Sequence, residues 1–313
     1  MEIQDYLNKK KAIQQDLLDY LDDEEEDGSN KDHQFIKWLN NSKISENRAE
    51  LTEFINLLLP IASNHRRSSN FLILDIKQTY SNIEIYNIFQ GNRRLLFFIV
   101  NSNILSVSDL IEFMHISDKR FRDYEFAAYF WPEVKDYCMQ NLQYCYIHTI
   151  KSFLTNEQCS MSPQEFTEKR KKGENDQYIL ELIRKDDIIE FVQYVTKHDY
   201  RLNSKVQYSI FESNNILCNE ETTLIEYAAF FGSIQIFQYL NMNNVDLSPL
   251  LIFYAIHSDN AELIHLIEEL KIDDEIKNKT QKYFSEAIKC HHNNLANYYR
   301  INSVTHVDLL PYF

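Results

Sequence analysis

The feature of this sequence that most constrains its fold is an internal repeat in the second half of the chain. When Tyr227–Leu240 (YAAFFGSIQIFQYL) is set above Tyr254–Ile267 (YAIHSDNAELIHLI), small and apolar residues coincide at a spacing of 27 residues. Glu286–Tyr299 (EAIKCHHNNLANYY) repeats the pattern 32 residues later, and Glu181–Val195 (ELIRKDDIIEFVQYV) is a weaker, earlier copy. Periods of this length are typical of folds in which similar units stack on one another.

Each copy predicts a short helix, a sharp turn and a second short helix. Gly232, Asp259 and His291 stand at the turn. Glycine adopts a left-handed conformation freely, and Asp, Asn and His tolerate a positive φ better than most residues. We therefore expect a turn between two helices in every copy, and no catalytic loop at Gly232.

Three alanines occupy equivalent positions in the first helix of the copies: Ala228, Ala255 and Ala287. A helix pair cannot bury its apolar face alone, and a small residue lets the axes of neighbouring helices approach closely. The repeat therefore predicts an all-α fold, a right-handed solenoid of stacked helix-turn-helix units with further helices before it.

Composition and charge exclude several classes of protein. Only four glycines and five prolines among 313 residues favour helices over a glycine-rich α/β enzyme or a β-sandwich. Five cysteines without a CxxC pair predict reduced thiols, and neither a signal peptide nor a membrane-spanning run is visible. A net charge of −15 opposes nucleic-acid binding, so we read the basic run Lys169–Lys172 as a solvated helix end or linker. We expect a cytoplasmic or nuclear monomer with no membrane insertion.

Sequence patterns for catalysis and cofactor binding are missing. GxSxG, GxGxxG, the Walker loop and HExxH do not occur. The acidic run after Asp23 imitates a calcium loop but has Gln34 where a bidentate glutamate is required. His257 and His265 lie eight residues apart across a predicted turn, and no second group of ligands stands at a suitable spacing. We therefore expect no catalytic residues, no cofactor and no metal.

The segment TLIEYAAFFGSIQIFQYL resembles the ankyrin repeat, whose T-P-L-H-x-A-A-x-x-G-x-L pattern it follows at Thr223, Ala228, Ala229 and Gly232. Leu224 replaces the proline of that pattern, and Glu226 replaces the histidine. More narrowly, the copies are similar to a large ankyrin family, a domain of unknown function, that is expanded in a lineage of protist parasites. The resemblance covers residues 177–301, is suggestive in residues 85–150, and is not visible before residue 72.

This resemblance implies a division of the chain and a partner-binding surface. Residues 1–70 form an N-terminal helical region with an acidic loop at 22–30, residues 71–154 form helices or degenerate ankyrin-like repeats, and residues 155–176 form a polar linker. The ankyrin array then spans residues 177–305, and residues 306–313 are a tail or cap. In ankyrin repeats, partners contact the first helices before the turn and the loops between repeats. Carried over, these positions are Phe230, Phe231, His257, Ser258, Lys289, Cys290, Asn243, Asn244 and Asp246.

We expect the protein to be a non-catalytic scaffold or adaptor that binds a protein partner through the concave face of the array. The acidic composition favours a basic partner. An enzyme or a ligand receptor with a pocket in the N-terminal helical region is the alternative. A homotypic structural role through the apolar end VDLLPYF is a third possibility.

Overall fold

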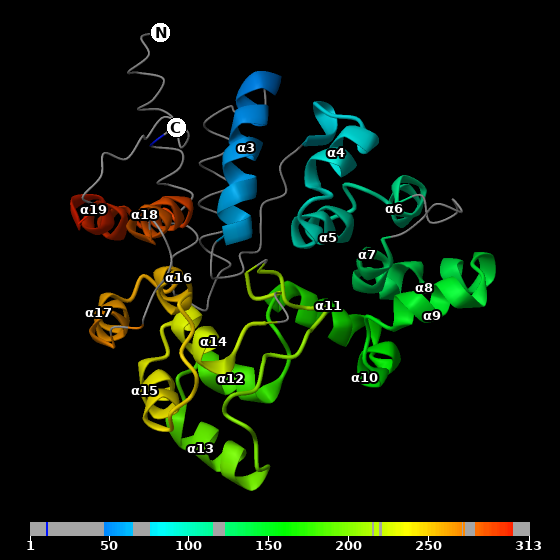
Figure 1. Ribbon diagram of the computed structural model, residues 1–313. Helices are drawn as coiled ribbons and strands as arrows, with labels where there is room; N and C mark the ends of the chain where they lie inside the picture. Colours follow the sequence, from blue (N-terminus) through cyan, green and yellow to red (C-terminus); the bar gives the residue numbers. More distant parts are fainter. Residues whose placement is uncertain are drawn as a thin grey trace, which may run out of the picture. The chain divides into compact units, whose positions relative to one another are not determined.

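The computed structural model describes Lys11 and residues 47–64, 76–114, 123–214, 216–218, 221–270, 272 and 279–302. Over these residues the fold is all-α, as predicted (Figure 1): the helices run from α3 to α19, with one short 3-10 helix. The described residues form no strand, and only one isolated antiparallel bridge joins Lys205 to Thr223. The acidic loop 22–30, the imitation of a calcium loop and the tail 306–313 lie outside the described residues.

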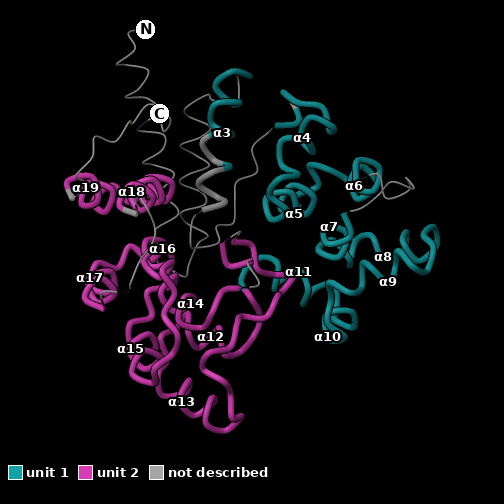
Figure 2. Tube along the Cα trace, in the orientation of Figure 1, with its two compact units in different colours: residues 1–63, 67–174 teal, residues 64–66, 175–313 magenta. Residues whose placement is uncertain are grey.

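The chain divides into two compact units, which Figure 2 distinguishes by colour. Unit 1 consists of residues 1–63 and 67–174, and unit 2 of residues 64–66 and 175–313. The change from unit 1 to unit 2 at Glu174–Asn175 falls inside the segment predicted to be a polar linker. Within that segment the structure has helices at Asn156–Ser160 and Pro163–Lys172, the second capped by Ser162 with Pro163 in its first turn.

The described residues of unit 1 form α-helices and one 3-10 helix. They are α3 (Arg48–Asn64), η2 (Ile76–Gln78), α4 (Asn82–Phe89), α5 (Arg93–Asn101), α6 (Val107–Phe113), α7 (Tyr124–Tyr129), α8 (Trp131–Asn141), α9 (Tyr144–Lys151), α10 (Asn156–Ser160) and α11 (Pro163–Lys172). Several of these helices begin directly after a polar residue that caps them. Ser81, Ser106 and Thr155 each form a capping box with the residue three positions later.

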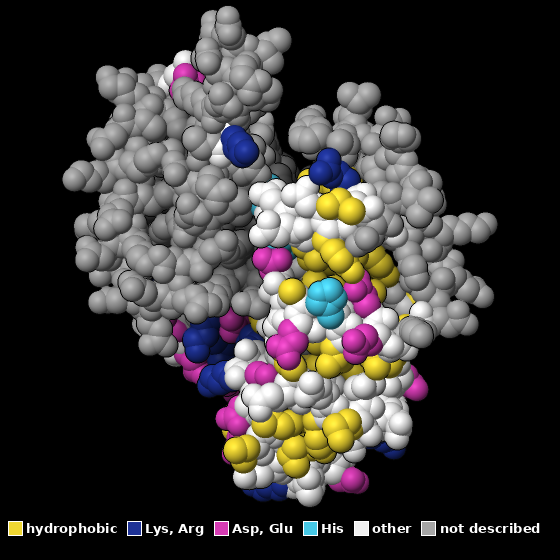
Figure 3. All heavy atoms as spheres, turned by 90° about the vertical axis from the view of Figure 1, so that its left-hand side faces the viewer, with side chains coloured by type: hydrophobic (Ala, Val, Ile, Leu, Met, Phe, Trp, Pro, Cys, Tyr) yellow, Lys and Arg dark blue, Asp and Glu magenta, His cyan; other side chains and the backbone are white. Residues whose placement is uncertain are grey.

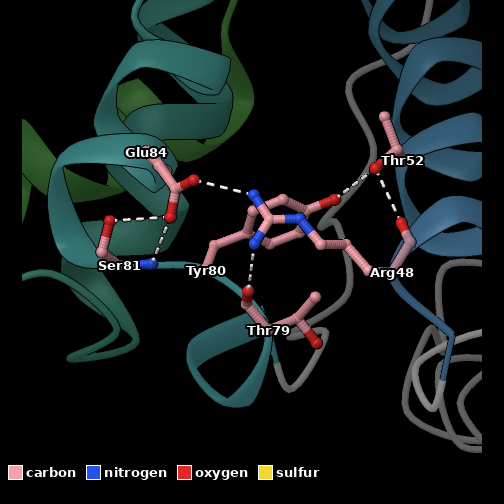
Figure 4. A network of polar contacts seen from close by, with 6 residues as sticks. All are labelled: Arg48, Thr52, Thr79, Tyr80, Ser81 and Glu84. Carbon is pink, nitrogen blue, oxygen red and sulfur yellow. Dashed lines mark hydrogen bonds and ion pairs between the residues drawn. The ribbon is translucent and has the colours of Figure 1, made fainter.

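Glu84, which forms the capping box with Ser81, also connects α4 to α3 (Figure 4). The Glu84 carboxylate accepts hydrogen bonds from the Ser81 amide at 2.9 Å and from the Arg48 guanidinium at 2.7 Å. Arg48 also donates to the carbonyl oxygen of Thr79. The backbone hydrogen bond from Ser81, followed by the one from Arg48, lowers the pKa of Glu84 to about 2. The start of α3 is therefore held on the start of α4 by a charged contact.

The basic run in α11 contains a fully buried arginine. The Arg170 guanidinium donates two hydrogen bonds to the Glu133 carboxylate, at 2.5 and 3.0 Å, and lies 4.1 Å from the ring centre of Phe97. The rings of Phe166 and Tyr129 also lie close to it. The interpretation of this run as a solvated helix end was thus wrong for Arg170, because its planar cation stacks on aromatic rings and pairs with a carboxylate.

The described residues of unit 2 form four pairs of helices. The pairs are α12 (Tyr178–Arg184) with α13 (Ile188–Lys197), α14 (Leu224–Phe231) with α15 (Ile234–Met242), α16 (Leu251–Ile256) with α17 (Ala261–Glu269), and α18 (Lys279–Lys289) with α19 (Asn293–Asn302). The first helices pack in sequence order, α12 on α14, α14 on α16 and α16 on α18, as Figure 1 shows. Ala228, Ala255 and Ala287 are fully buried in this core. The helix pairs and buried alanines of the repeat are therefore present.

The turns between paired helices have the predicted backbone conformation. Gly232, Asp259 and His291 have φ angles of 72°, 50° and 61°, and Asp186 adopts 50° at the equivalent place in the first pair. In three of the turns, the amide of the residue after the left-handed one donates a hydrogen bond to the carbonyl oxygen five residues earlier, as in Ser233 N to Ala228 O at 3.0 Å. This bond pattern ends a helix sharply and satisfies its last carbonyl groups.

Successive turns also contact one another. The Asp186 carboxylate in the first turn accepts hydrogen bonds from the amides of Gln235 and Ile236, at the start of α15. The Ser233 hydroxyl donates to the carbonyl oxygen of Ile183 at 2.5 Å. A Cβ atom added to Gly232 would lie only 3.2 Å from the Cβ atom of Ser258 in the next turn. The turns therefore fix the spacing between neighbouring pairs.

Candidate functional site

One position of the first helix joins each pair to the next. Arg184, Phe230 and His257 are equivalent in the repeat, and each contacts the first helix of the following pair. Arg184 donates to the Tyr227 hydroxyl at 2.6 Å, the Phe230 ring stacks on the His257 ring at 4.9 Å, and His257 meets Glu286. A row of inter-pair contacts, different in chemistry at each step, therefore runs through unit 2.

The last of these contacts is a buried cluster of three side chains, His257, Glu286 and Cys290. His257 stands at the C-terminal end of α16, Glu286 lies in the last turn of α18, and Cys290 directly follows α18. His257 Nε2 is 3.1 Å from Glu286 Oε1, and Cys290 Sγ is 3.4 Å from His257 Nδ1. Lys289, which is exposed, donates to the other carboxylate oxygen at 3.1 Å. The cluster thus joins the third pair to the fourth.

Burial and charge act differently on the two acidic groups of this cluster. Burial raises the pKa of Glu286, but the hydrogen bonds from His257 and Lys289 outweigh it, so the pKa lies below its ordinary value of 4.5. Burial and the nearby Glu286 charge raise the pKa of the Cys290 thiol well above its ordinary value. At neutral pH Glu286 is therefore a carboxylate, and Cys290 keeps its proton.

The order thiol, imidazole, carboxylate is that of a nucleophilic triad, but the geometry differs from one. Cys290 Sγ lies 3.4 Å from His257 Nδ1 and 3.8 Å from Nε2. An atom in line with one ring nitrogen would lie much farther from the other, so the thiol sits beside the ring and not in the direction of proton transfer. A reactive cysteine also needs a lowered pKa, whereas that of Cys290 is raised. The cluster is therefore not an activated nucleophile.

The same three side chains offer donor atoms for a metal ion. Their ligand atoms lie within 4.8 Å of one another. Among the described residues, no other group of three or more His, Cys, Asp or Glu side chains has its ligand atoms this close together. Short ligand spacings in the sequence do not indicate this group, because His257 and Glu286 are 29 residues apart. The repeat could have indicated them, since stacking brings the first helices of successive copies together.

The predicted partner-binding residues fall into two groups. The side chains of Phe230, His257 and Cys290 are buried, so their assignment to an accessible surface was wrong; each packs against the neighbouring pair. The half-buried and exposed members are Phe231, Ser258, Lys289, Asn243, Asn244 and Asp246. The last three belong to one segment, which we call the 242–250 loop.

The 242–250 loop exposes apolar side chains on a fixed backbone. Met242 and Leu250 at its two ends are 80% and 49% exposed, while Val245 between them is buried. The Asp246 amide donates to Asn203 Oδ1 at 2.9 Å, and the Ser248 hydroxyl donates to Glu226 Oε1 at 2.5 Å. Glu226 is itself held in the capping box of α14. This loop is therefore anchored to the segment after α13 and to the start of α14.

Other exposed apolar side chains lie on the second helices of the pairs, at Ile189, Tyr298 and Ile301. Figure 3 shows the side of the molecule that carries α15, α17 and α19, where hydrophobic and acidic side chains are exposed next to one another. Glu262, His265 and Glu269 of α17 are exposed. This side of unit 2 thus exposes apolar and negative groups next to one another.

Comparisons with known proteins identify no relative. No protein-family model matches the chain, and no curated protein and no solved structure matches it. None of the described helices is both long enough and apolar enough to cross a bilayer.

Proposed function

We propose that this protein is a non-catalytic scaffold in which an ankyrin-like unit 2 binds a protein partner through the loops between its helix pairs. The stacking of first helices in sequence order and the four left-handed turns support the ankyrin-like interpretation. Stacks of this kind present extended surfaces without needing a pocket. The anchored 242–250 loop, with its exposed Met242 and Leu250, carries the proposal.

Because the first helices are largely buried, we place the partner on the loops between the pairs and not on the first helices themselves. Phe230 and His257 already contact neighbouring pairs, so a partner would have to displace them. The 242–250 loop needs no such rearrangement, because its polar anchors hold it while its apolar ends face solvent. Loops that are ordered before binding lose little conformational entropy when a partner binds.

The partner that suits this surface is a protein with apolar and basic side chains. Asp246 lies between the two exposed apolar residues, and the whole chain carries a net charge of −15. Opposite charge on the partner would accelerate association and fix its orientation, while burial of Met242 and Leu250 would supply affinity.

The experiment is affinity capture from an extract of the source cells with wild-type protein and a Met242→Ser, Leu250→Ser double variant. We expect a specific protein to bind the wild type and to be lost, or reduced at least about tenfold, with the variant, because apolar contacts at the centre of an interface dominate its affinity. Captured proteins are then purified, and their affinities are measured by calorimetry.

The matched control is Met139→Ser, which removes an exposed methionine of unit 1, outside the 242–250 loop. This variant should retain the captured protein, and circular dichroism should show that all three proteins are equally folded. Equal capture by the double variant would contradict the proposed surface, and catalytic turnover of a small molecule by the purified chain would contradict the non-catalytic role.

A further inference from the structure

The buried cluster between α16 and α18 combines nitrogen, sulfur and oxygen donors. The three residues come from two helix pairs, and their ligand atoms lie within 4.8 Å of one another. Magnesium and calcium prefer oxygen ligands alone, whereas zinc binds cysteine, histidine and carboxylate together. The Phe230 ring covers one face of the imidazole, which gives the cluster an apolar neighbour.

We propose that the cluster binds one Zn²⁺ ion through His257 Nε2, Glu286 Oε1 and Cys290 Sγ. Nε2 and Oε1 are 3.1 Å apart, a separation that allows both to ligate one ion at about 2.0–2.2 Å each. Lys289 donates to the other oxygen of Glu286, so Oε1 remains directed towards His257. The ion would then join the third helix pair to the fourth.

Binding requires Cys290 to move. Its Sγ atom lies closer to Nδ1 than to Nε2, at 3.4 and 3.8 Å, so the thiol must rotate about its single side-chain torsion to reach an ion on Nε2. The S–H bond of Cys290 breaks as the S–Zn bond forms, and that proton passes to solvent. The proton that His257 Nε2 shares with Glu286 must also leave this nitrogen, so the zinc-bound imidazole carries its proton on Nδ1 instead. A crystal structure with zinc should therefore show Cys290 in a different rotamer.

A fourth ligand-type group lies at the same junction. Asp259, in the turn after α16, is paired with His292 at 3.6 Å, and its charge acts on the Cys290 thiol. About half of the Asp259 side chain is exposed, so this turn gives the junction an edge that solvent reaches.

The test uses full-length protein freed of metal by chelation and titrated with Co²⁺, which reports thiolate ligation through a charge-transfer absorption band. We expect one equivalent of Co²⁺ to produce this band and Zn²⁺ to abolish it by displacement. The band should be lost in Cys290→Ser and kept in Cys145→Ser, which changes an exposed cysteine of unit 1. Glu286→Gln should weaken cobalt binding at least about tenfold, since mutations at metal ligands and their supporting groups have effects of this size.

A second measurement on the wild-type protein covers the case in which Cys290→Ser does not fold. Each cysteine is alkylated in mild denaturant with and without Zn²⁺, and its modification is followed by mass spectrometry. Zinc should slow modification of Cys290 and leave that of Cys145 unchanged. A missing charge-transfer band in the wild type, or equal alkylation of Cys290 with and without zinc, would overturn the proposal.

Discussion

Unit 1 and unit 2 both consist of short helices, but different residues hold the helices together. In unit 1 the fully buried Arg170 binds Glu133 and stacks on aromatic rings from several helices. In unit 2, a left-handed turn recurs in all four described pairs and a buried alanine in three of them, while the contact at the Arg184, Phe230 and His257 position changes its chemistry. The buried ion pair of unit 1 is therefore a single contact between particular residues, whereas the contacts of unit 2 follow a pattern that repeats.

The largest effect is expected from a charge placed in the stacked core of unit 2. Ala255→Glu should lower the free energy of unfolding by about 4 kcal/mol or more, because it overpacks a fully buried position and buries a carboxylate. Urea unfolding followed by circular dichroism measures this. The same substitution at the exposed Ala261 should change the free energy by less than about 0.5 kcal/mol; equal losses would show that Ala255 is not at a stacking contact.

The corresponding change in unit 1 is Arg170→Ala. It should cost about 3 kcal/mol, since it leaves Glu133 without its buried partner and opens a cavity among the rings. Both tryptophans, Trp38 and Trp131, belong to unit 1, so fluorescence during urea unfolding reports on this unit. Lys171→Gln, which breaks only the exposed pair with Glu168, should cost less than about 0.5 kcal/mol. An equally small loss for Arg170→Ala would contradict its structural role.

A smaller effect should separate two glycines, one from each unit. Gly232→Ala should cost about 1–2 kcal/mol, because Gly232 has a φ of 72° and an added Cβ would lie 3.2 Å from that of Ser258. Gly91→Ala in unit 1 meets nothing within 4 Å and should be close to neutral. Thermal unfolding of the two variants measures the difference, and a neutral Gly232→Ala would show that the turn does not need glycine.

The smallest effect concerns the exposed contact between α3 and α4. Because the pKa of Glu84 is about 2 in the folded protein, below its ordinary 4.5, its contribution to stability is complete above about 4.5 and is lost as the pH falls towards 2. Arg48→Gln should raise this pKa, though not fully to 4.5, because the Ser81 amide still donates to the carboxylate. Carboxyl carbon NMR shifts measured against pH test this, with Lys77→Gln as the control; an unchanged pKa in Arg48→Gln would contradict the contact.

The sequence predicted the local features of unit 2 better than any feature of unit 1. The turns at Gly232, Asp259 and His291 and the buried alanines follow from residue types at a fixed spacing, so pattern analysis could find them. Arg170 could not be found in this way, because its place in a basic run indicates solvent, and only the fold brings Phe97 and Glu133 to it.

The sequence indicated some residues of the candidate site but not their burial or their shared partner. His257, Lys289 and Cys290 were singled out as surface positions by analogy with ankyrin repeats, but stacking buries His257 and Cys290 beside Glu286, which the sequence did not mark. Burial depends on how closely the next pair approaches, and a single copy of a repeat does not contain that information.

The central claim, that each helix pair of unit 2 packs on the next through one repeated position, is tested most directly by NMR. Nuclear Overhauser effects in selectively labelled protein should link Arg184 to Tyr227, Phe230 to His257, and His257 to Cys290, since these groups are in contact. Observation of all three would establish the sequential stack. Strong effects within each pair, with none between Phe230 and His257 or across the other two interfaces, would contradict it.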